Sequence, residues 1–245
     1  FIPKNVVASM LKSGQEAKLG VMSRNITTFF SDIANFTTIC ESMKPSELLV
    51  LLTEYVSLSL SHTHTHTLFF HLLLLHTQNY NNNNNRYFDS MSPLIIDTDG
   101  SVLDYIGDAV LACWNAPQDV NAHGYMCVKQ ALEMHKRLEV LRVRWKAKGY
   151  LPVHIRCGIH TASVFVGNIG GTRRMKYSVL GDGVAMAERC EDGNKKYGSR
   201  VMITEATYRE SKVATSFLTR KLDWIEVKDF NGPCAIYQVF CERKE

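Results

Sequence analysis

Two apolar, strand-like stretches each carry an aspartate to a point where the backbone is expected to turn. The first ends just before Asp32, and the second, over 101–114, turns at Gly107-Asp108. Mg²⁺ prefers oxygen ligands and usually takes one or two carboxylates together with substrate phosphates. Carboxylates on neighbouring strands can hold two such ions about 3.5–4 Å apart, whereas a lone Gly-Asp pair is usually only a turn. The pattern predicts neighbouring strands, with a metal–triphosphate site as one interpretation and two ordinary turns as the other.

The rest of the chain alternates between strand-like and helix-like hydrophobic patterns. Helices are expected at 45–55, 121–148 and 182–197; the first has proline at an early position, and Gly198 ends the last. Strands are expected at 25–30, 153–160, 163–169, 176–180, 201–204 and 235–240. This alternation favours an α+β or α/β sandwich.

The composition is that of one large domain. The chain has 245 residues, of which 45% are hydrophobic and 21% charged, which is ordinary for a packed domain. The net charge of +4 is mild and the basic residues form no block, so no nucleic-acid partner is expected. Seven cysteines without a CxxC pair predict reduced thiols in the cytosol. Because the chain begins with Phe1, we expect a fragment of a longer protein.

Composition changes abruptly over 56–86, where the sequence is VSLSLSHTHTHTLFFHLLLLHTQNYNNNNNR. The helix expected at 45–55 runs into this segment and resumes at 87–91. Its histidines allow metal binding, its leucine-rich run is far too short to span a membrane, and its asparagines are typical of a disordered linker.

We favour a fourth interpretation of this segment, a retained intron translated in frame. His-Thr repeats are what a CA dinucleotide repeat encodes, Val56-Ser57 fits a splice-donor pattern, and the leucine and phenylalanine run fits a pyrimidine tract. The histidines then have no function. The expected consequence is a loop that breaks the first core helix. The entropic cost of closing such a loop is tolerable, but the loop interrupts helix packing.

Four segments occur in an order that is informative: "TTFFSDIANFTTICE", "DGSVLDYIGDAVLACWNAP", "HIRCGIHTASVFVGNIGGTRRMKYSVLGDGVAMAERCE" and "YGSRVMITEATY". Together they resemble the catalytic domains of the class III nucleotide cyclases, the adenylate and guanylate cyclases. The resemblance implies an α+β fold with a ferredoxin-like βαββαβ core and additional strands, paired head to tail with a second cyclase domain. It divides the chain into a linker segment at 1–24 and a catalytic domain at 25–241, interrupted at 56–86.

The resemblance assigns one half of an active site to metal and phosphate. Asp32 and Asp108 are expected to bind two divalent ions, Mg²⁺ or Mn²⁺, with the Ile33 carbonyl as a further ligand. One ion acidifies the nucleotide's 3′-hydroxyl and the other holds its triphosphate. Arg156 matches a phosphate-contacting arginine, the alternative being an ordinary exposed strand residue, and Lys228 is matched loosely to a triphosphate-contacting lysine. Phosphate oxygens are also expected to be cradled by backbone N–H groups before a predicted helix, those of Ala34, Asn35, Phe36 and Thr37.

The half that recognises the purine and the transition state departs from the family pattern. Asp104 stands where adenylate cyclases typically have lysine and guanylate cyclases glutamate, and Ser178 stands at the second purine-facing position. A carboxylate accepts hydrogen bonds from guanine, although aspartate is one methylene shorter than glutamate; the alternative is a solvated hairpin residue. Arg189 matches the transition-state arginine, but Ala185 replaces the expected asparagine, a loss comparable to a missing preorganised donor, about 10²–10³ in rate.

The implied function is conversion of ATP or GTP to a 3′,5′-cyclic nucleotide and pyrophosphate, in intracellular signal transduction. Here the protein supplies mainly positioning and charge neutralisation. The base-facing residues favour GTP, whereas the general motif style is nearer to the adenylate cyclases, so both substrates stay open. The alternative is a weak or inactive pseudo-cyclase that serves as a dimerisation module or as the metal-supplying half of a heterodimer. In either case we expect a cytoplasmic domain of a larger membrane-associated or multidomain protein.

Overall fold

The computed structural model describes residue 7 and residues 19–52, 87–171, 174–226 and 232–244. The strands in these ranges are β1 (Gly20–Ile33), β2 (Ser101–Ile106), β3 (Ala109–Trp114), β4 (Ile155–Gly171), β5 (Arg174–Leu180), β6 (Val201–Thr204), β7 (Phe217–Ile225) and β8 (Cys234–Glu242). The longer helices are α2 (Phe36–Ser42), α3 (Pro45–Leu52), α6 (Tyr87–Ile96), α7 (His123–Ala147) and α8 (Asp182–Tyr197). Two short helices, α9 (Glu205–Tyr208) and α10 (Val213–Ser216), follow β6.

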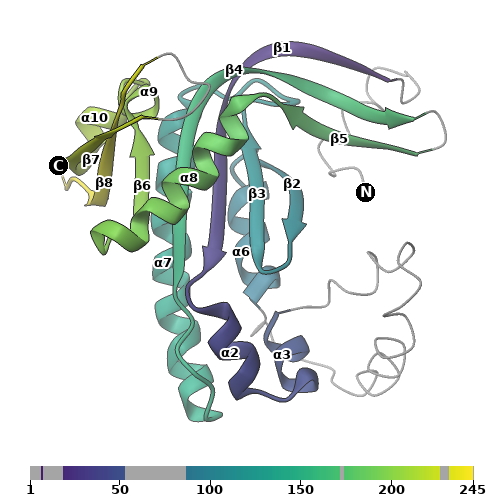
Figure 1. Ribbon diagram of the computed structural model, residues 1–245, viewed down its shortest axis with the longest axis vertical. Coiled ribbons are helices and arrows are strands. Elements are labelled where there is room, and N and C mark those ends of the chain that lie inside the picture. Colours follow the sequence, from purple (N-terminus) through teal and green to yellow (C-terminus); the bar gives the residue numbers. More distant parts are fainter. Residues whose placement is uncertain (1–6, 8–18, 53–86, 172–173, 227–231, 245) are drawn as a thin grey trace.

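The described strands form one sheet in the order β2-β3-β1-β4-β6-β8-β7, with β5 paired on β4 (Figure 1). The first four strands in this order are antiparallel neighbours. With helices between β1 and β2 and α7 between β3 and β4, they make the expected ferredoxin-like βαββαβ core. β6 joins β4 in parallel and is followed by antiparallel β8 and β7. The predicted α+β fold is confirmed.

The two central strands are longer than the sequence predicts. β1 begins at Gly20 rather than at residue 25, and β4 is continuous where two strands, 153–160 and 163–169, were expected. The register joins β1 and β4 without a break from Gly20↔Asn168 to Ile33↔Ile155. Thr161 lies between the two expected strands and pairs with Thr27 of β1. Its hydroxyl lies 2.8 Å from that of Thr27, and the ladder continues through this pair.

Other predicted elements agree closely with the structure. The hairpin over 101–114 forms as β2 and β3, α8 spans 182–197, and β6 spans 201–204. Gly198 ends α8 in a left-handed conformation with φ of 60°, the conformation that favours glycine at a helix end. β7 was missed because it is an edge strand whose only buried residue is Phe217, so it has little apolar alternation.

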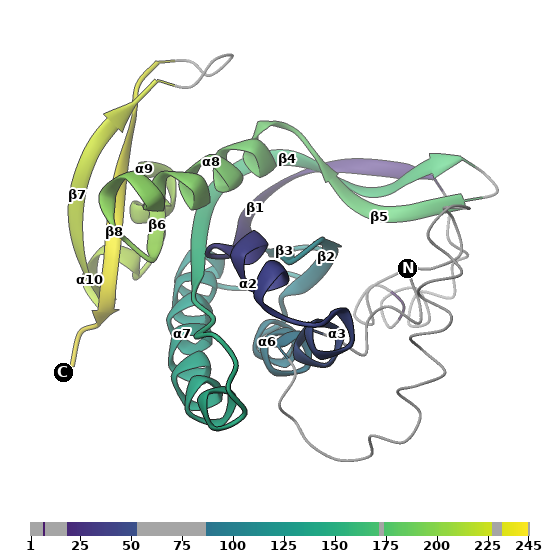
Figure 2. The same cartoon turned by 60° about the horizontal axis from the view of Figure 1, so that its bottom comes forward.

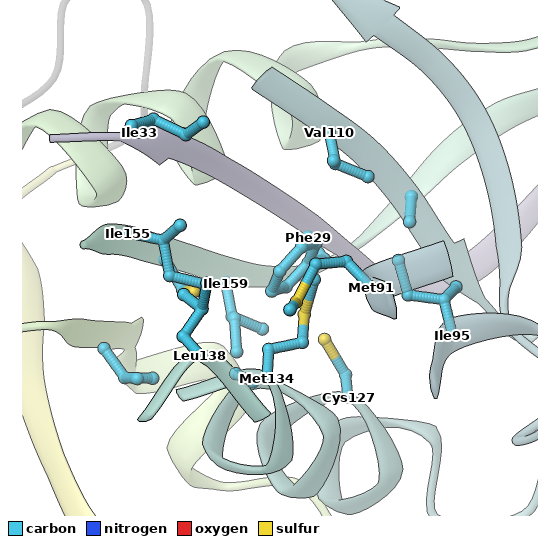
Figure 3. Close-up of a cluster of buried hydrophobic side chains, with 14 of the residues drawn as sticks. Phe29, Ile33, Met91, Ile95, Val110, Cys127, Met134, Leu138, Ile155 and Ile159 are labelled. Carbon is cyan, nitrogen blue, oxygen red and sulfur yellow. The ribbon is translucent and has the colours of Figure 1, made fainter. Parts of the chain in front are cut away.

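Helices cover both faces of the sheet. Figure 2 shows α3, α6 and α7 on one side of β1–β3 and α8 on the other. The larger core lies under α6 and α7, where Phe29 of β1, Met91 of α6 and Met134 of α7 are fully buried (Figure 3). A second apolar cluster on the other face includes Phe30 and Ala187 of α8. The central strands are therefore held on both sides, which fixes the residues at their ends.

The segment 56–86 lies outside the described residues, so the retained-intron interpretation stays a prediction. On either side of the undescribed stretch, α3 and α6 contact each other, and Leu51 of α3 and Tyr87 of α6 belong to the same core. None of the helices in the described ranges is both long and apolar enough to cross a lipid bilayer.

Candidate active site

Asp32 and Asp108 approach each other at one end of the central strands. Asp32 is the last but one residue of β1, and Asp108 lies in the turn between β2 and β3. This turn contains Gly107 with φ of 65°, a left-handed conformation that glycine adopts without strain. Because β3 pairs with β1 up to Val110↔Ser31, the turn reaches the end of β1. There the Ile33 N–H donates a hydrogen bond to Asp108 Oδ2 at 3.1 Å.

Burial and the neighbouring Asp32 perturb the Asp108 carboxyl. The pKa of Asp108 is raised from 3.8 to about 7, first by burial and then by a hydrogen bond with Asp32 and by its negative charge. Like-charged carboxylates that share a site cannot both ionise easily, and a divalent cation between them removes this repulsion. Hard oxygen donors with excess negative charge therefore fit Mg²⁺ or Mn²⁺. Within the described residues, no cluster of three or more acidic, histidine or cysteine side chains is arranged to hold a metal.

The chain turns into α2 immediately after β1. Asn35 precedes this helix in a left-handed conformation with φ of 58°, and the amides of Phe36 and Thr37 open the first turn. The Ala34 N–H was expected to bind a phosphate oxygen. This expectation is wrong, because the Ala34 N–H donates to the His154 carbonyl at 2.8 Å. The main-chain groups left for a phosphate are those at the start of α2, beyond Ala34.

Arg156 lies on β4 directly opposite Asp32 in the register. It is only 9% exposed, so the alternative of an ordinary exposed strand arginine is wrong. Its Nε donates to Glu191 Oε1 of α8 at 2.7 Å, and its Nη2 lies 3.4 Å from Asp32 Oδ2. The guanidinium thus connects α8 to the carboxylate pair. Glu191 was missed in the sequence because its partner is 35 positions away.

The base-facing candidates lie on β2 and β5. Asp104 of β2 accepts a hydrogen bond from Lys176 Nζ of β5 at 2.5 Å, and both side chains are more than a third exposed, so the roles of base reader and solvated hairpin residue both stay open. Ser178 is two positions after Lys176 on the same strand and is half-buried. Side chains two apart on a strand share one face, so Lys176 is a further residue of this group. Its position two before Ser178 was the available sequence signal.

The remaining candidates lie on α8. Ala185 and Arg189 are both exposed and are four positions apart, which places them on one face of the helix. Within the described residues, no hydrogen bond or ion pair joins Arg189 or Asp104 to Asp32, Asp108 or Arg156. Lys228 lies outside the described residues. The metal-facing and base-facing groups are therefore not brought together as one contiguous site in the single chain.

Comparisons with known proteins identify the family of this chain. The family described as "Adenylate and Guanylate cyclase catalytic domain" matches residues 73–241. The chain belongs to this family. Adenylate cyclase 1 of Rhizobium meliloti (strain 1021) is 29% identical over 239 residues, which cover 98% of this chain and 31% of that protein. Adenylate cyclase of Anabaena cylindrica is 28% identical, covering 98% of this chain and 42% of that protein.

Solved cyclase structures have the same fold. The adenylyl cyclase CyaB from P. aeruginosa superposes with a TM-score of 0.68 at 28% identity, covering 92% of this chain and 98% of that one. The guanylyl cyclase Cya2 superposes with a TM-score of 0.67 at 24% identity, over 90% and 94% of the two chains. The predicted family membership is confirmed: this is a nucleotide cyclase catalytic domain. It spans less than half the length of the two curated relatives.

The family match begins at residue 73, after the strand that carries Asp32. The two curated relatives nevertheless align over 98% of this cyclase domain. The candidate site of this cyclase domain consists of a half-buried aspartate pair, a buried arginine beside it, and a separate base-facing group.

Proposed function

We propose that this cyclase domain converts ATP or GTP to the 3′,5′-cyclic nucleotide and pyrophosphate. One observation carries the proposal: two aspartates meet at the end of β1, where burial and then the neighbouring Asp32 raise the pKa of Asp108 to about 7, and a buried arginine lies beside Asp32. Catalytic domains of this family use a divalent metal. Asp32, Asp108 and the Ile33 carbonyl are the groups that would hold it. When bound, the metal acidifies the 3′-hydroxyl and neutralises the triphosphate.

The protein's own contribution is positioning. Arg156 offers a guanidinium with several fixed donors, held beside Asp32, near where a triphosphate would lie if divalent cations linked it to the carboxylates. The opening amides of α2 offer further N–H donors to phosphate oxygens. Because phosphoryl transfer needs little covalent chemistry from the protein, these groups supply what the reaction requires on the metal side.

On the base side, Lys176 holds the Asp104 carboxylate by an ion pair. A carboxylate accepts hydrogen bonds from guanine N1–H and its exocyclic amine, whereas it repels the N1 lone pair of adenine. These residues favour GTP, although the two relatives compared above are named adenylate cyclases. Turnover of each nucleotide in competition with the other decides between them.

We further propose that the working unit contains two cyclase domains, paired head to tail, in the cytosol. Arg189 and Ala185 lie on an exposed face of α8, where they are accessible to a partner's nucleotide. Four exposed apolar residues, Val21, Met22, Phe165 and Leu180, lie along the paired strands β1, β4 and β5, and apolar patches of this kind mark protein contacts. All seven cysteines are unpaired, in keeping with a reducing compartment.

A specific observation favours a second candidate function. Ala185 carries no group that can orient the ribose, so a homodimer has two impaired sites, whereas a heterodimer can combine this chain's metal half with another domain's complete base half. The second candidate is therefore a weak cyclase or pseudo-cyclase that works as the metal-supplying partner.

The test is product formation by the purified chain with ATP or GTP in Mn²⁺ or Mg²⁺, measured by chromatography. We expect slow turnover that Asp32→Ala abolishes and Ala185→Asn increases. We also expect a sharp rise on mixing with a cyclase domain that lacks metal aspartates but keeps its base and transition-state residues. Turnover unaffected by Asp32→Ala contradicts the site. Nucleotide binding without turnover in every mixture supports the pseudo-cyclase instead.

A further inference from the structure

The Arg156 guanidinium is shared between two carboxylates that belong to different elements. Its Nε donates to Glu191 Oε1 at 2.7 Å, and its Nη2 lies 3.4 Å from Asp32 Oδ2. The Glu191 contact is the shorter one and the more deeply buried, because the Glu191 side chain is 6% exposed and that of Asp32 is 29% exposed. Arg156 is thus anchored at its Nε by α8, while its Nη2 faces the metal carboxylates.

Close packing of α8 on β4 fixes this anchor. A Cβ atom on Gly158 of β4 would lie 2.0 Å from the Ala187 carbonyl oxygen and 2.2 Å from the Glu191 nitrogen. Any side chain at this position would push the helix away, so glycine is required for the observed approach. Asn194, one turn further along α8, donates to the Cys157 carbonyl at 3.0 Å. The backbone of Glu191 is therefore held at a set distance from the strand that carries Arg156.

The ion pair between Arg156 and Glu191 affects how strongly Arg156 binds Asp32. Asp32 and Glu191 both contact the one guanidinium of Arg156, and Asp108 lies beside Asp32, so the carboxylates at this site outnumber the single cation. If Arg156 lost Glu191, its whole charge would be directed to Asp32. Asp32 is also a proposed metal ligand, so a guanidinium paired fully with it competes with the divalent cation. A guanidinium turned towards Asp32 is also withdrawn from the phosphate.

We propose that Glu191 is a positioning residue for Arg156. By holding Nε, it keeps the guanidinium from closing on Asp32 and leaves the Nη nitrogens free to turn to a phosphate oxygen when nucleotide and metal bind. The inference rests on the proposed function, since it concerns the same site. It adds a residue whose effect is exerted through Arg156 and not by contact with the nucleotide.

The experiment measures binding directly. Mn²⁺ affinity is measured by electron paramagnetic resonance, and nucleotide affinity by calorimetry with 3′-deoxy-ATP and 3′-deoxy-GTP, which lack the attacking hydroxyl. Glu191→Gln is expected to weaken both Mn²⁺ and nucleotide binding about tenfold, roughly 1.4 kcal/mol for each. The matched control is Asp192→Asn, which removes the next carboxylate on α8; its partner is the exposed Lys195. It is expected to change neither affinity by more than about twofold.

The double variant Arg156→Met/Glu191→Gln separates positioning from a merely structural role. With the guanidinium gone, Asp32 is released, so Mn²⁺ affinity is expected to return to the wild-type value or above it, while nucleotide affinity stays low. A structural role predicts no such split between the two ligands. Unchanged Mn²⁺ binding in Glu191→Gln, or Mn²⁺ binding that stays weak in the double variant, overturns the proposal.

Two further outcomes are distinguished. Removing one partner of a buried ion pair is strongly destabilising, and if Glu191→Gln does not fold, Arg156→Met is compared with the double variant. Without Arg156 there is nothing to position, so loss of Glu191 is expected to change nucleotide affinity less than twofold, and a larger loss overturns the proposal. Absence of wild-type turnover counts against the proposed function, whereas the Mn²⁺ measurements still decide the role of Glu191.

Discussion

Replacing Asp108 by asparagine is expected to stabilise the metal-free domain while removing its response to metal. In the folded chain the pKa of Asp108 is raised from 3.8 to about 7, by burial first and by Asp32 second. Between these two pH values the folded state binds more protons than the unfolded state, so the free energy of unfolding falls as pH rises through this window. Asparagine has no such titration and can still accept the Ile33 N–H bond.

The magnitude follows from the size of the shift. One pKa unit corresponds to about 1.4 kcal/mol, so a shift of roughly three units sets a ceiling of about 4 kcal/mol above pH 7. Asp108 is only partly buried, so solvent screening reduces the expected gain to about 1–2 kcal/mol at pH 8. At pH 5 the wild-type carboxyl is already protonated, and the gain is expected to be below about 0.5 kcal/mol.

The assay is urea unfolding in a chelator at pH 5 and pH 8, for the wild-type chain, Asp108→Asn and the control Asp97→Asn. Asp97 is an exposed aspartate away from the site. Repeating the series with Mn²⁺ is expected to stabilise the wild type, because a ligand that binds only the folded state raises its stability, but not Asp108→Asn. If Asp108→Asn and the wild type show the same change in stability from pH 5 to pH 8, the crowding of the two carboxylates is refuted.

Two further substitutions and one deletion are expected to have measurable effects. Lys176→Met removes the ion pair that holds Asp104, and is expected to lower kcat/KM for the preferred nucleotide about tenfold; an unchanged ATP to GTP ratio would show that this pair does not read the base. Thr27→Val removes the buried hydroxyl 2.7 Å from His123 Nδ1 and should cost about 1–3 kcal/mol in urea unfolding, whereas a loss below about 0.5 kcal/mol contradicts this network. Deleting 56–86 should raise soluble yield and melting temperature because α3 and α6 share one core; a deletion that unfolds the domain disproves the insertion hypothesis.

Much of the fold was predictable because its signals are local. The turn between β2 and β3, the helix 182–197 and its glycine end, and the strand 201–204 each depend on a short window of residues, and each was predicted within a residue or two. The ends of strands, and the breaks between them, were harder to predict. Two strands were expected at 153–160 and 163–169, and only the unbroken pairing of β4 with β1 shows that they are one strand.

The candidate site divides in the same way. The sequence by itself determined the family, and it predicted which residues carry the chemistry: Asp32, Asp108 and Arg156 stand in motifs with an informative order. It also located the departures at Asp104 and Ala185. These inferences need only residue identity and spacing along the chain.

The tertiary structure alone decided which charges meet. Arg156 finds Glu191 35 positions later and Asp104 finds Lys176 72 positions later, because strand register and the packing of α8 on Gly158 bring them together. The commitment of the Ala34 amide to the His154 carbonyl was likewise invisible in the sequence. The physical reason is range: hydrophobic periodicity and turn propensity act over a few residues, whereas an ion pair forms wherever the folded sheet brings its two members together.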